Sequence, residues 1–98
     1  MELRILKYFL IVAREENITK AATQLHVTQP TLSRQIQQLE TELGVNLFER
    51  SSHNITLTQE GVMFKRRAQE IVNLTEKTKR EMMNIDELIS GEITIGGG

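Results

Sequence analysis

Apolar and polar positions alternate along the first part of the chain with the spacing of amphipathic helices. In the segment 3–16, apolar residues recur at steps of three and four, which predicts a helix with one buried side. Asn17 interrupts this pattern, and Thr19 is a suitable N-cap for a second, short helix that is expected to end near Leu25. The pattern thus predicts a longer helix followed by a short one.

A third helix has the clearest pattern. Thr28 can cap it, and Pro30 falls in its first turn, where the missing amide of a proline costs little. Gly44 suits the left-handed position after its last turn. The predicted inner side of this helix consists of Leu32, Ile36, Leu39 and Leu43.

Two short apolar stretches, 45–48 and 55–57, follow and are separated by the polar run 50–54. This arrangement predicts a small β-hairpin. Thr58 can then cap a last helix over 59–90, a segment without proline that would be roughly 48 Å long. Such a helix is too long to pack along its whole length against the small domain formed by the preceding elements, which we call the head.

Apolar or small residues recur along this last helix at alternating steps of four and three, which is the spacing of a heptad seam. The first turns can pack on the chain's own first helix. Beyond Ile71 the head is too small to cover the seam, so a second copy of the helix is the expected partner. The predicted dimer interface comprises Phe64, Ala68, Ile71, Thr75, Thr78, Met82, Ile85 and Ile89.

The end of the chain has a different pattern. Residues 92–95 alternate in polarity like a β-strand that has no partner in the chain. We therefore expect three parts: a head over 1–58, a dimerisation helix over 59–90 and, in 91–98, the start of a domain that lies beyond this chain.

Composition narrows the function classes. The 98 residues include no cysteine, which excludes disulfides and cysteine-rich zinc sites and is compatible with a reducing cytoplasm. No apolar run approaches the roughly 20 residues that span a bilayer, so no membrane segment is expected. His26 and His53 lack the spacing of a metal pair, and no nucleophile, acid and base come together. We therefore expect no enzymatic activity, no metal and no cofactor.

The net charge of −1 conceals an asymmetry. Residues 1–67 hold nine Lys or Arg against seven Asp or Glu, whereas residues 68–98 hold three against six. Because phosphate binding needs local positive charge, a surface for nucleic acid is to be sought in the first part.

Two short helices joined by a tight break, the second with a polar outer side, meet the requirement of a helix-turn-helix. Arginine can bond a guanine edge bidentately, and glutamine an adenine edge. Because Glu40 and Glu42 come late in the third helix and would repel phosphate, its first two turns are expected to lie nearest DNA. The outward and flanking polar residues of this helix are Pro30, Thr31, Ser33, Arg34, Gln37, Gln38 and Thr41.

Taken alone, such a polar side is more typical of an ordinary solvated surface. The order of the elements, ending in a hairpin and a long helix, favours a mainly α-helical winged helix-turn-helix with the hairpin as its wing. Arg50 and His53 are the cationic candidates in this wing. Arg50 could instead form a surface ion pair with Glu49 or Glu60, and His53 could be an ordinary turn residue.

A dense signature runs from Ala21 to Gly61. It reads AAxxLxVTQPTLSRQIxxLExxLGVxLFxR over 21–50 and LTxxG over 57–61. This signature closely resembles the N-terminal part of LysR-type transcriptional regulators. The long helix and the stretch GxIxIG over 91–96 also resemble that family's linker helix and the first strand of its effector-binding domain.

The resemblance implies a winged helix-turn-helix that contacts double-stranded DNA, and antiparallel pairing of two linker helices in a homodimer, or a tetramer in a longer form. It also implies a small-molecule effector, bound by a C-terminal domain outside this chain. Many family members have two or more basic residues at the wing tip, where this chain has mainly uncharged ones. The DNA contacts implied by the resemblance are Thr28, Gln29, Pro30, Thr31, Ser33, Arg34, Arg50 and His53, to which the outer side of the helix adds Gln37 and Gln38.

The sequence therefore predicts a cytoplasmic, homodimeric transcriptional regulator that binds a dyad-symmetric DNA site. An alternative from another class is a coiled-coil interaction module whose winged head binds protein, which the mild acidity of the chain would suit. Retention on duplex DNA at low salt distinguishes the two.

Overall fold

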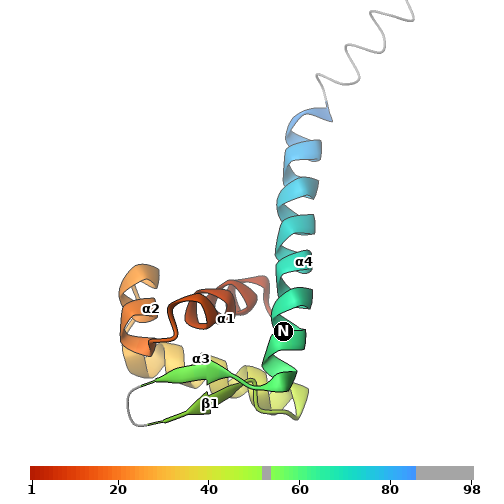
Figure 1. The fold of residues 1–98 in the computed structure, drawn as a ribbon. Coiled ribbons are helices and arrows are strands. Elements are labelled where there is room, and N and C mark those ends of the chain that lie inside the picture. Colours follow the sequence, from red (N-terminus) through yellow and green to blue (C-terminus); the bar gives the residue numbers. More distant parts are fainter. Residues whose placement is uncertain (52–53, 86–98) are drawn as a thin grey trace, which may run out of the picture.

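The computed structural model describes residues 1–51 and 54–85, and these form a helical head from which one helix projects (Figure 1). The sequence prediction of a mainly helical chain with a small hairpin and a long last helix is confirmed. Residues 86–98, which include the expected end of the last helix, Ile89 and the strand at 92–95, lie outside the described residues. The elements in chain order are α1 (Leu3–Glu15), α2 (Ile18–Leu25), α3 (Gln29–Leu43), β1 (Phe48–Arg50), β2 (Ile55–Leu57) and α4 (Gln59–Met83).

Side-chain caps determine where three of the helices begin. The Thr28 hydroxyl accepts a hydrogen bond from Thr31 N at the start of α3, and the Thr58 hydroxyl accepts one from Gly61 N at the start of α4, as the sequence predicted. The expectation for α2 was wrong. Its N-cap is Asn17, whose Oδ1 accepts from Lys20 N at 2.9 Å, and Thr19 lies inside the helix.

An aromatic cluster holds the core together. Phe9 of α1 is fully buried, with its ring centroid 5.3 Å from that of Phe48 in β1 and 5.0 Å from that of Phe64 in α4. The pair with Phe64 is edge-to-face, a geometry that aromatic rings favour beyond simple burial. These three rings join the first helix, the hairpin and the long helix into one packing unit.

The hairpin is shorter and shifted relative to its prediction. β1 begins at Phe48 and not at Val45, and it pairs antiparallel with β2 so that Phe48 faces Leu57 and Arg50 faces Ile55. The chain leaves α3 at Gly44, which has a left-handed φ of 73°. Before β1 begins, the N–H of Leu47 donates to the Glu40 side chain of α3 and not to a strand partner. Arg50, which the sequence placed in the loop, is therefore a strand residue.

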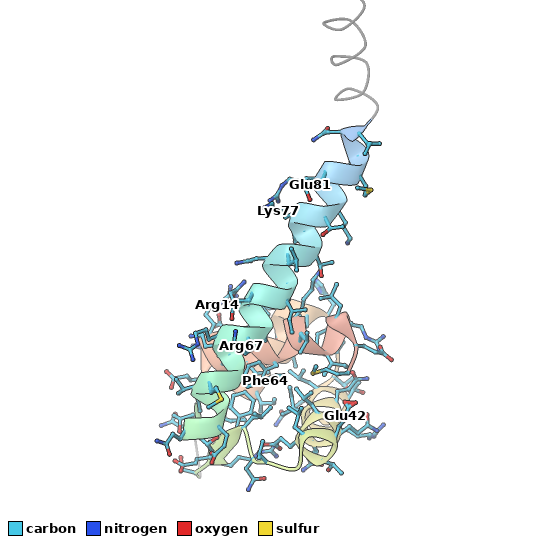
Figure 2. All side chains as sticks on the ribbon, turned by 90° about the vertical axis from the view of Figure 1, so that its right-hand side faces the viewer. Arg14, Glu42, Phe64, Arg67, Lys77 and Glu81 are labelled. Carbon is cyan, nitrogen blue, oxygen red and sulfur yellow. The ribbon has the colours of Figure 1, made fainter. Side chains whose placement is uncertain are left out.

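The first half of α4 packs on the head and the second half extends beyond it (Figures 1 and 2). Ala68 is fully buried and Val72 packs against the same core. Further along, Lys7 Nζ of α1 lies 3.3 Å from Glu76 Oε1. The first turns of α4 therefore pack with the head, and the division of the chain after residue 58 stays a prediction.

Gly61 marks the closest approach of α4 to the chain before the hairpin. A β-carbon added there would lie 2.1 Å from the carbonyl oxygen of Leu47 and 2.9 Å from Leu57 Cδ2. Glycine is in general a weak helix former. The structure shows instead that the absence of a side chain lets α4 begin directly against the backbone of Leu47.

We expect Gly61→Ala to lower the free energy of unfolding by about 1–3 kcal/mol, because the new methyl group must displace backbone. In an unconstrained helix the same change would stabilise by up to about 1 kcal/mol, so the sign of the effect tests the contact. Thermal and denaturant unfolding measure it. The control is Met63→Ala in the same turn, where the side chain is 63% exposed and a change within about 0.5 kcal/mol is expected.

Candidate nucleic-acid interface

A tight turn fixes α3 relative to α2. His26 ends α2 in a left-handed conformation with φ of 57°, and its N–H bonds Thr23 O at 3.2 Å. Val27 N then donates to Ala22 O at 3.1 Å before Thr28 starts the next helix. His26 is a turn residue, and the two helices have the short connection that a helix-turn-helix requires.

The two sides of α3 are divided as the sequence predicted. Leu32 and Ile36 are fully buried and Leu39 is nearly so, while Leu43 is half-buried. The opposite side is open: its exposed residues are Gln29, Pro30, Arg34, Gln37, Gln38 and Thr41, with Thr31 and Ser33 half-buried.

Arg34 is the cation of this outer side. It is exposed in the second turn of α3, and within residues 1–51 and 54–85 it forms neither a salt bridge nor a side-chain hydrogen bond. Its guanidinium therefore keeps its five N–H donors for a ligand. This is the arrangement that bidentate reading of a guanine edge needs.

The first turn of α3 is partly occupied by its own hydrogen bonds. The Thr28 hydroxyl donates to Thr31 Oγ1 at 2.8 Å while it caps the helix, and Thr19 Oγ1 donates to Gln29 Oε1 at 3.1 Å. Thr28 is therefore first a capping residue. The amide nitrogen of Gln29 keeps its donors for a ligand.

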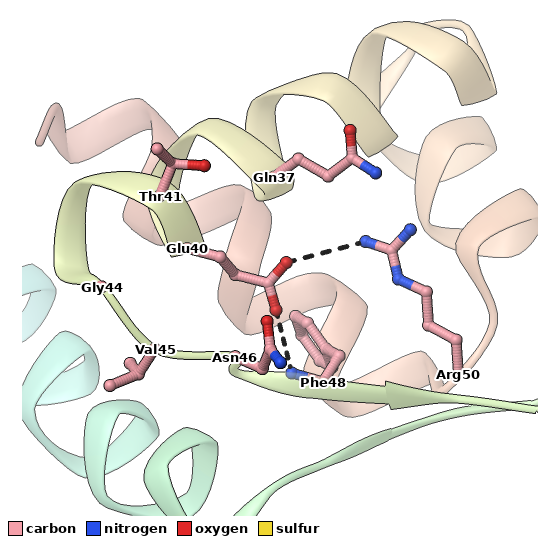
Figure 3. Close-up of a pocket in the computed structure, with 8 residues that line it drawn as sticks. All are labelled: Gln37, Glu40, Thr41, Gly44, Val45, Asn46, Phe48 and Arg50. Carbon is pink, nitrogen blue, oxygen red and sulfur yellow. Dashed lines mark hydrogen bonds and ion pairs between the residues drawn. The ribbon is translucent and has the colours of Figure 1, made fainter.

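The hairpin brings Arg50 beside α3. Gln29 and Ser33 line one hollow with Arg50, between the first turns of α2 and α3 and the hairpin. Gln37 lines a second hollow with Arg50, further along α3 (Figure 3). The structure thus brings four of the residues predicted to bind DNA to one surface. His53, the other wing candidate, lies outside the described residues.

Gln38 is separated from this surface. It lines a hollow with Arg4 and Ile5 of α1, on the flank of α3 that faces the start of the chain. Gln37 and Gln38 are neighbours in the sequence, but they line different hollows.

Arg50 has an acidic neighbour that the sequence analysis did not assign to it. Its Nη2 lies 3.9 Å from Glu40 Oε1, in place of the ion pairs considered with Glu49 or Glu60. Glu40 was interpreted only as a charge that would repel phosphate. Its side chain is 12% exposed and points toward the hairpin, an orientation that α-helical periodicity alone does not reveal.

The predicted dimer seam divides into two parts. Phe64 and Ala68 pack on the head, and Ala68 has no exposed surface left for a second chain. Further along α4, Ile71 is 40% exposed and Met82 is 56% exposed, while Thr75 is half-buried and Thr78 exposed. Ile85, which follows the end of α4 at Met83, is 40% exposed. Two exposed residues that the seam omitted extend this apolar surface: Leu74 at 62% and Met83 at 82%. Leu74, Thr75, Thr78 and Met82 line one shallow hollow with Met83.

Within residues 1–51 and 54–85, no helix combines the length and apolar character needed to cross a membrane. In the same part of the chain, no three His, Asp or Glu side chains gather as metal ligands.

Comparisons with known proteins agree with this geometry. The family model described as "Bacterial regulatory helix-turn-helix protein, lysR family" matches residues 3–62. The HTH-type transcriptional regulator BsdA of Bacillus subtilis is 45% identical over 97 residues, which cover 98% of this chain and 33% of BsdA. The HTH-type transcriptional regulator BenM of Acinetobacter baylyi is 43% identical over 90 residues, which cover 92% of this chain and 26% of BenM.

Two solved structures have the same fold. The BenM_DBD complex with catB site 1 DNA matches with a TM-score of 0.85 and 42% identity, covering 89% of this chain and 94% of that one. The CbnR_DBD–DNA complex matches with a TM-score of 0.85 and 43% identity, covering 88% and 99%. The chain spans about a third of the length of BsdA and about a quarter of that of BenM. With a family model over most of the head and solved structures over nearly nine tenths of the chain, this protein belongs to the LysR family of bacterial regulatory helix-turn-helix proteins.

Proposed function

We propose that this chain is the DNA-binding and dimer-forming part of a transcriptional regulator, and that α3 enters the major groove of duplex DNA. The exposed polar side of α3 is the observation that carries the proposal: Arg34, which has no partner among the described residues, lies opposite the buried Leu32 and Ile36. Both solved relatives reported above are bound to DNA. The alternative of a protein-binding head finds no support among these relatives.

Roles within the interface follow from exposure and chemistry. Arg34 reads a base edge, with Gln37 one turn further along the same side. The DNA backbone is contacted by three residues that border the hollows beside the hairpin: Gln29, Ser33 and Arg50. The hydrogen bond between Thr28 and Thr31 stabilises the first turn of α3. Pro30 packs against the groove, and Gln38 and His53 are peripheral contacts.

The rest of the proposal concerns the longer protein. Two copies pair through the exposed part of the seam and so present two heads to a dyad-symmetric site. A domain beyond this chain binds a small-molecule effector. The whole acts on DNA in the cytoplasm and carries out no catalysis, in keeping with the relatives, whose names are those of transcriptional regulators.

Selection of bound sequences from random duplexes tests DNA binding and reveals half-site symmetry in one experiment. Enrichment of a common motif in two inverted copies is expected. If no duplex is retained even at low salt, the proposal is wrong.

Arg34→Ala is expected to weaken binding to the selected site by about 1–3 kcal/mol and to relax the preference at one base position. The reason is the loss of a bidentate contact to a base edge. Fluorescence anisotropy with the selected duplex and its single-base variants measures both effects. Lys77→Ala, which removes an exposed cation from the far part of α4, is the control and should preserve the base preference. Equal losses on selected and random duplexes would assign Arg34 to the phosphate backbone.

A further inference from the structure

One carboxylate connects the proposed recognition helix with the wing. Glu40 Oε2, on α3, accepts hydrogen bonds from Leu47 N at 2.7 Å and from Phe48 N at 3.2 Å, where β1 begins. Its other oxygen, Oε1, faces Arg50 Nη2 at 3.9 Å (Figure 3). The same side chain therefore contacts the backbone at one end of β1 and the guanidinium at the other.

The environment of Glu40 compensates its charge. Two backbone N–H groups and one guanidinium point at a carboxylate that is only 12% exposed. Hydrogen bonds to a carboxylate are stronger than bonds between neutral groups, so this arrangement resists rotation of the side chain. Glu40 therefore differs from a free surface carboxylate, which would simply repel the phosphates of an approaching duplex.

Arg50 lies where the two hollows beside α3 meet. It lines the hollow that contains Gln29 and Ser33 and also the one that contains Gln37 and Glu40. Its side chain is 41% exposed, and the ion pair engages Nη2 alone. A guanidinium has five donors, so the others remain for an anion on the outer side. A backbone phosphate of the duplex read by α3 is an anion of that kind.

We propose that Glu40 is a positioning residue, which fixes the wing to α3 and holds the Arg50 guanidinium in place for a DNA backbone phosphate. This inference rests on the proposed function and deepens it by assigning a role to a residue without its own DNA contact. The advantage is entropic: an arginine side chain that is held before binding loses less freedom when it meets the phosphate.

A double-mutant cycle tests this role, with affinities for a mixed-sequence duplex measured by fluorescence anisotropy over a series of salt concentrations. Arg50→Ala is expected to weaken binding roughly tenfold and to reduce the salt slope by about one. Glu40→Gln keeps an oxygen that accepts from the N–H groups of Leu47 and Phe48 but loses the charge that faces Arg50. It should weaken binding roughly threefold or more in the unsubstituted chain, and it should add little further loss in the Arg50→Ala background.

Two further variants separate positioning from charge. Glu40→Asp keeps the negative charge but is too short to serve both β1 and Arg50, so it should weaken binding as Glu40→Gln does, and it serves as the test if Glu40→Gln fails to fold. Glu42→Gln removes an exposed carboxylate from the same helix and should leave binding unchanged or slightly tighter.

The outcomes are distinguishable. Tighter binding by Glu40→Gln, matching Glu42→Gln, would overturn the inference, because Glu40 would then be a repelling charge. Additive losses in the cycle would also overturn it. If the unsubstituted chain fails to bind the duplex at low salt, the proposed function itself fails, and this is seen before any variant is compared.

Discussion

Ile36→Ala is expected to lower the free energy of unfolding by about 2–5 kcal/mol. Ile36 is fully buried in the middle of α3, and Leu32 and Leu39 lie one turn before and after it on the same side, each nearly or fully buried. Removing its side chain beyond Cβ leaves a cavity in the close-packed core, which cannot be filled without moving α1 or α2. For a head this small, such a loss is a large part of the total stability.

Urea unfolding followed by circular dichroism measures this effect. The matched control is Gln37→Ala, the next residue of the same helix, whose side chain is exposed and whose change should alter stability by no more than about 0.5 kcal/mol. Gln37→Ala should instead change DNA binding. The contradictory outcome is an Ile36→Ala chain that unfolds at the same urea concentration but no longer binds DNA, because that behaviour would belong to an exposed contact residue.

The local pattern was enough to predict α3 and its two sides. Its start at Thr28, its end at Gly44 and its buried side follow from neighbouring residues alone, and the structure confirms all three. The start of α2 was not predicted, because Asn17 and Thr19 are both good N-caps and local preference does not choose between them. Asn17 is used, so α2 begins two residues earlier than expected and includes Thr19.

Contacts between residues far apart in the chain could not be predicted in this way. β1 begins at Phe48 because the backbone before it is bonded to Glu40, and no short-range pattern reports that bond. The need for glycine at position 61 could not be predicted either, because the carbonyl of Leu47 that it accommodates lies fourteen positions earlier. The outward face of α3 was thus predictable, whereas the residues that hold the wing against it were not.

The dimer seam shows how a regular pattern can serve two contacts. The heptad spacing continues without a break from Phe64 to Ile85, yet its first two residues pack on α1 of the same chain. Periodicity indicates which side of a helix is apolar, but it does not indicate what covers that side. Of the described seam residues, those after Ala68 leave the most apolar surface exposed for a partner.

Changing Ile71 and Met82 together to Lys is expected to convert a dimer into a monomer that keeps its head fold. Both residues are exposed within one chain, at 40% and 56%, so the lysines should not disturb the core. In a pair of helices they would place like charges in the contact. Since two tethered heads bind a paired site through a high effective concentration, the variant should bind a half-site weakly and lose most of its preference for the paired site.

Sedimentation measures the association state, and thermal unfolding checks that the head remains intact. The matched control is Gln69→Lys with Asn73→Lys, which adds the same two charges at exposed positions outside the seam and should leave the dimer unchanged. A double variant that still sediments as a dimer would locate the contact elsewhere, with the head or the hairpin as the next surfaces to test. An unsubstituted chain that stays monomeric at high concentration would refute pairing through α4 altogether. The exposed Leu74 and Met83 would then remain uncovered by a second copy.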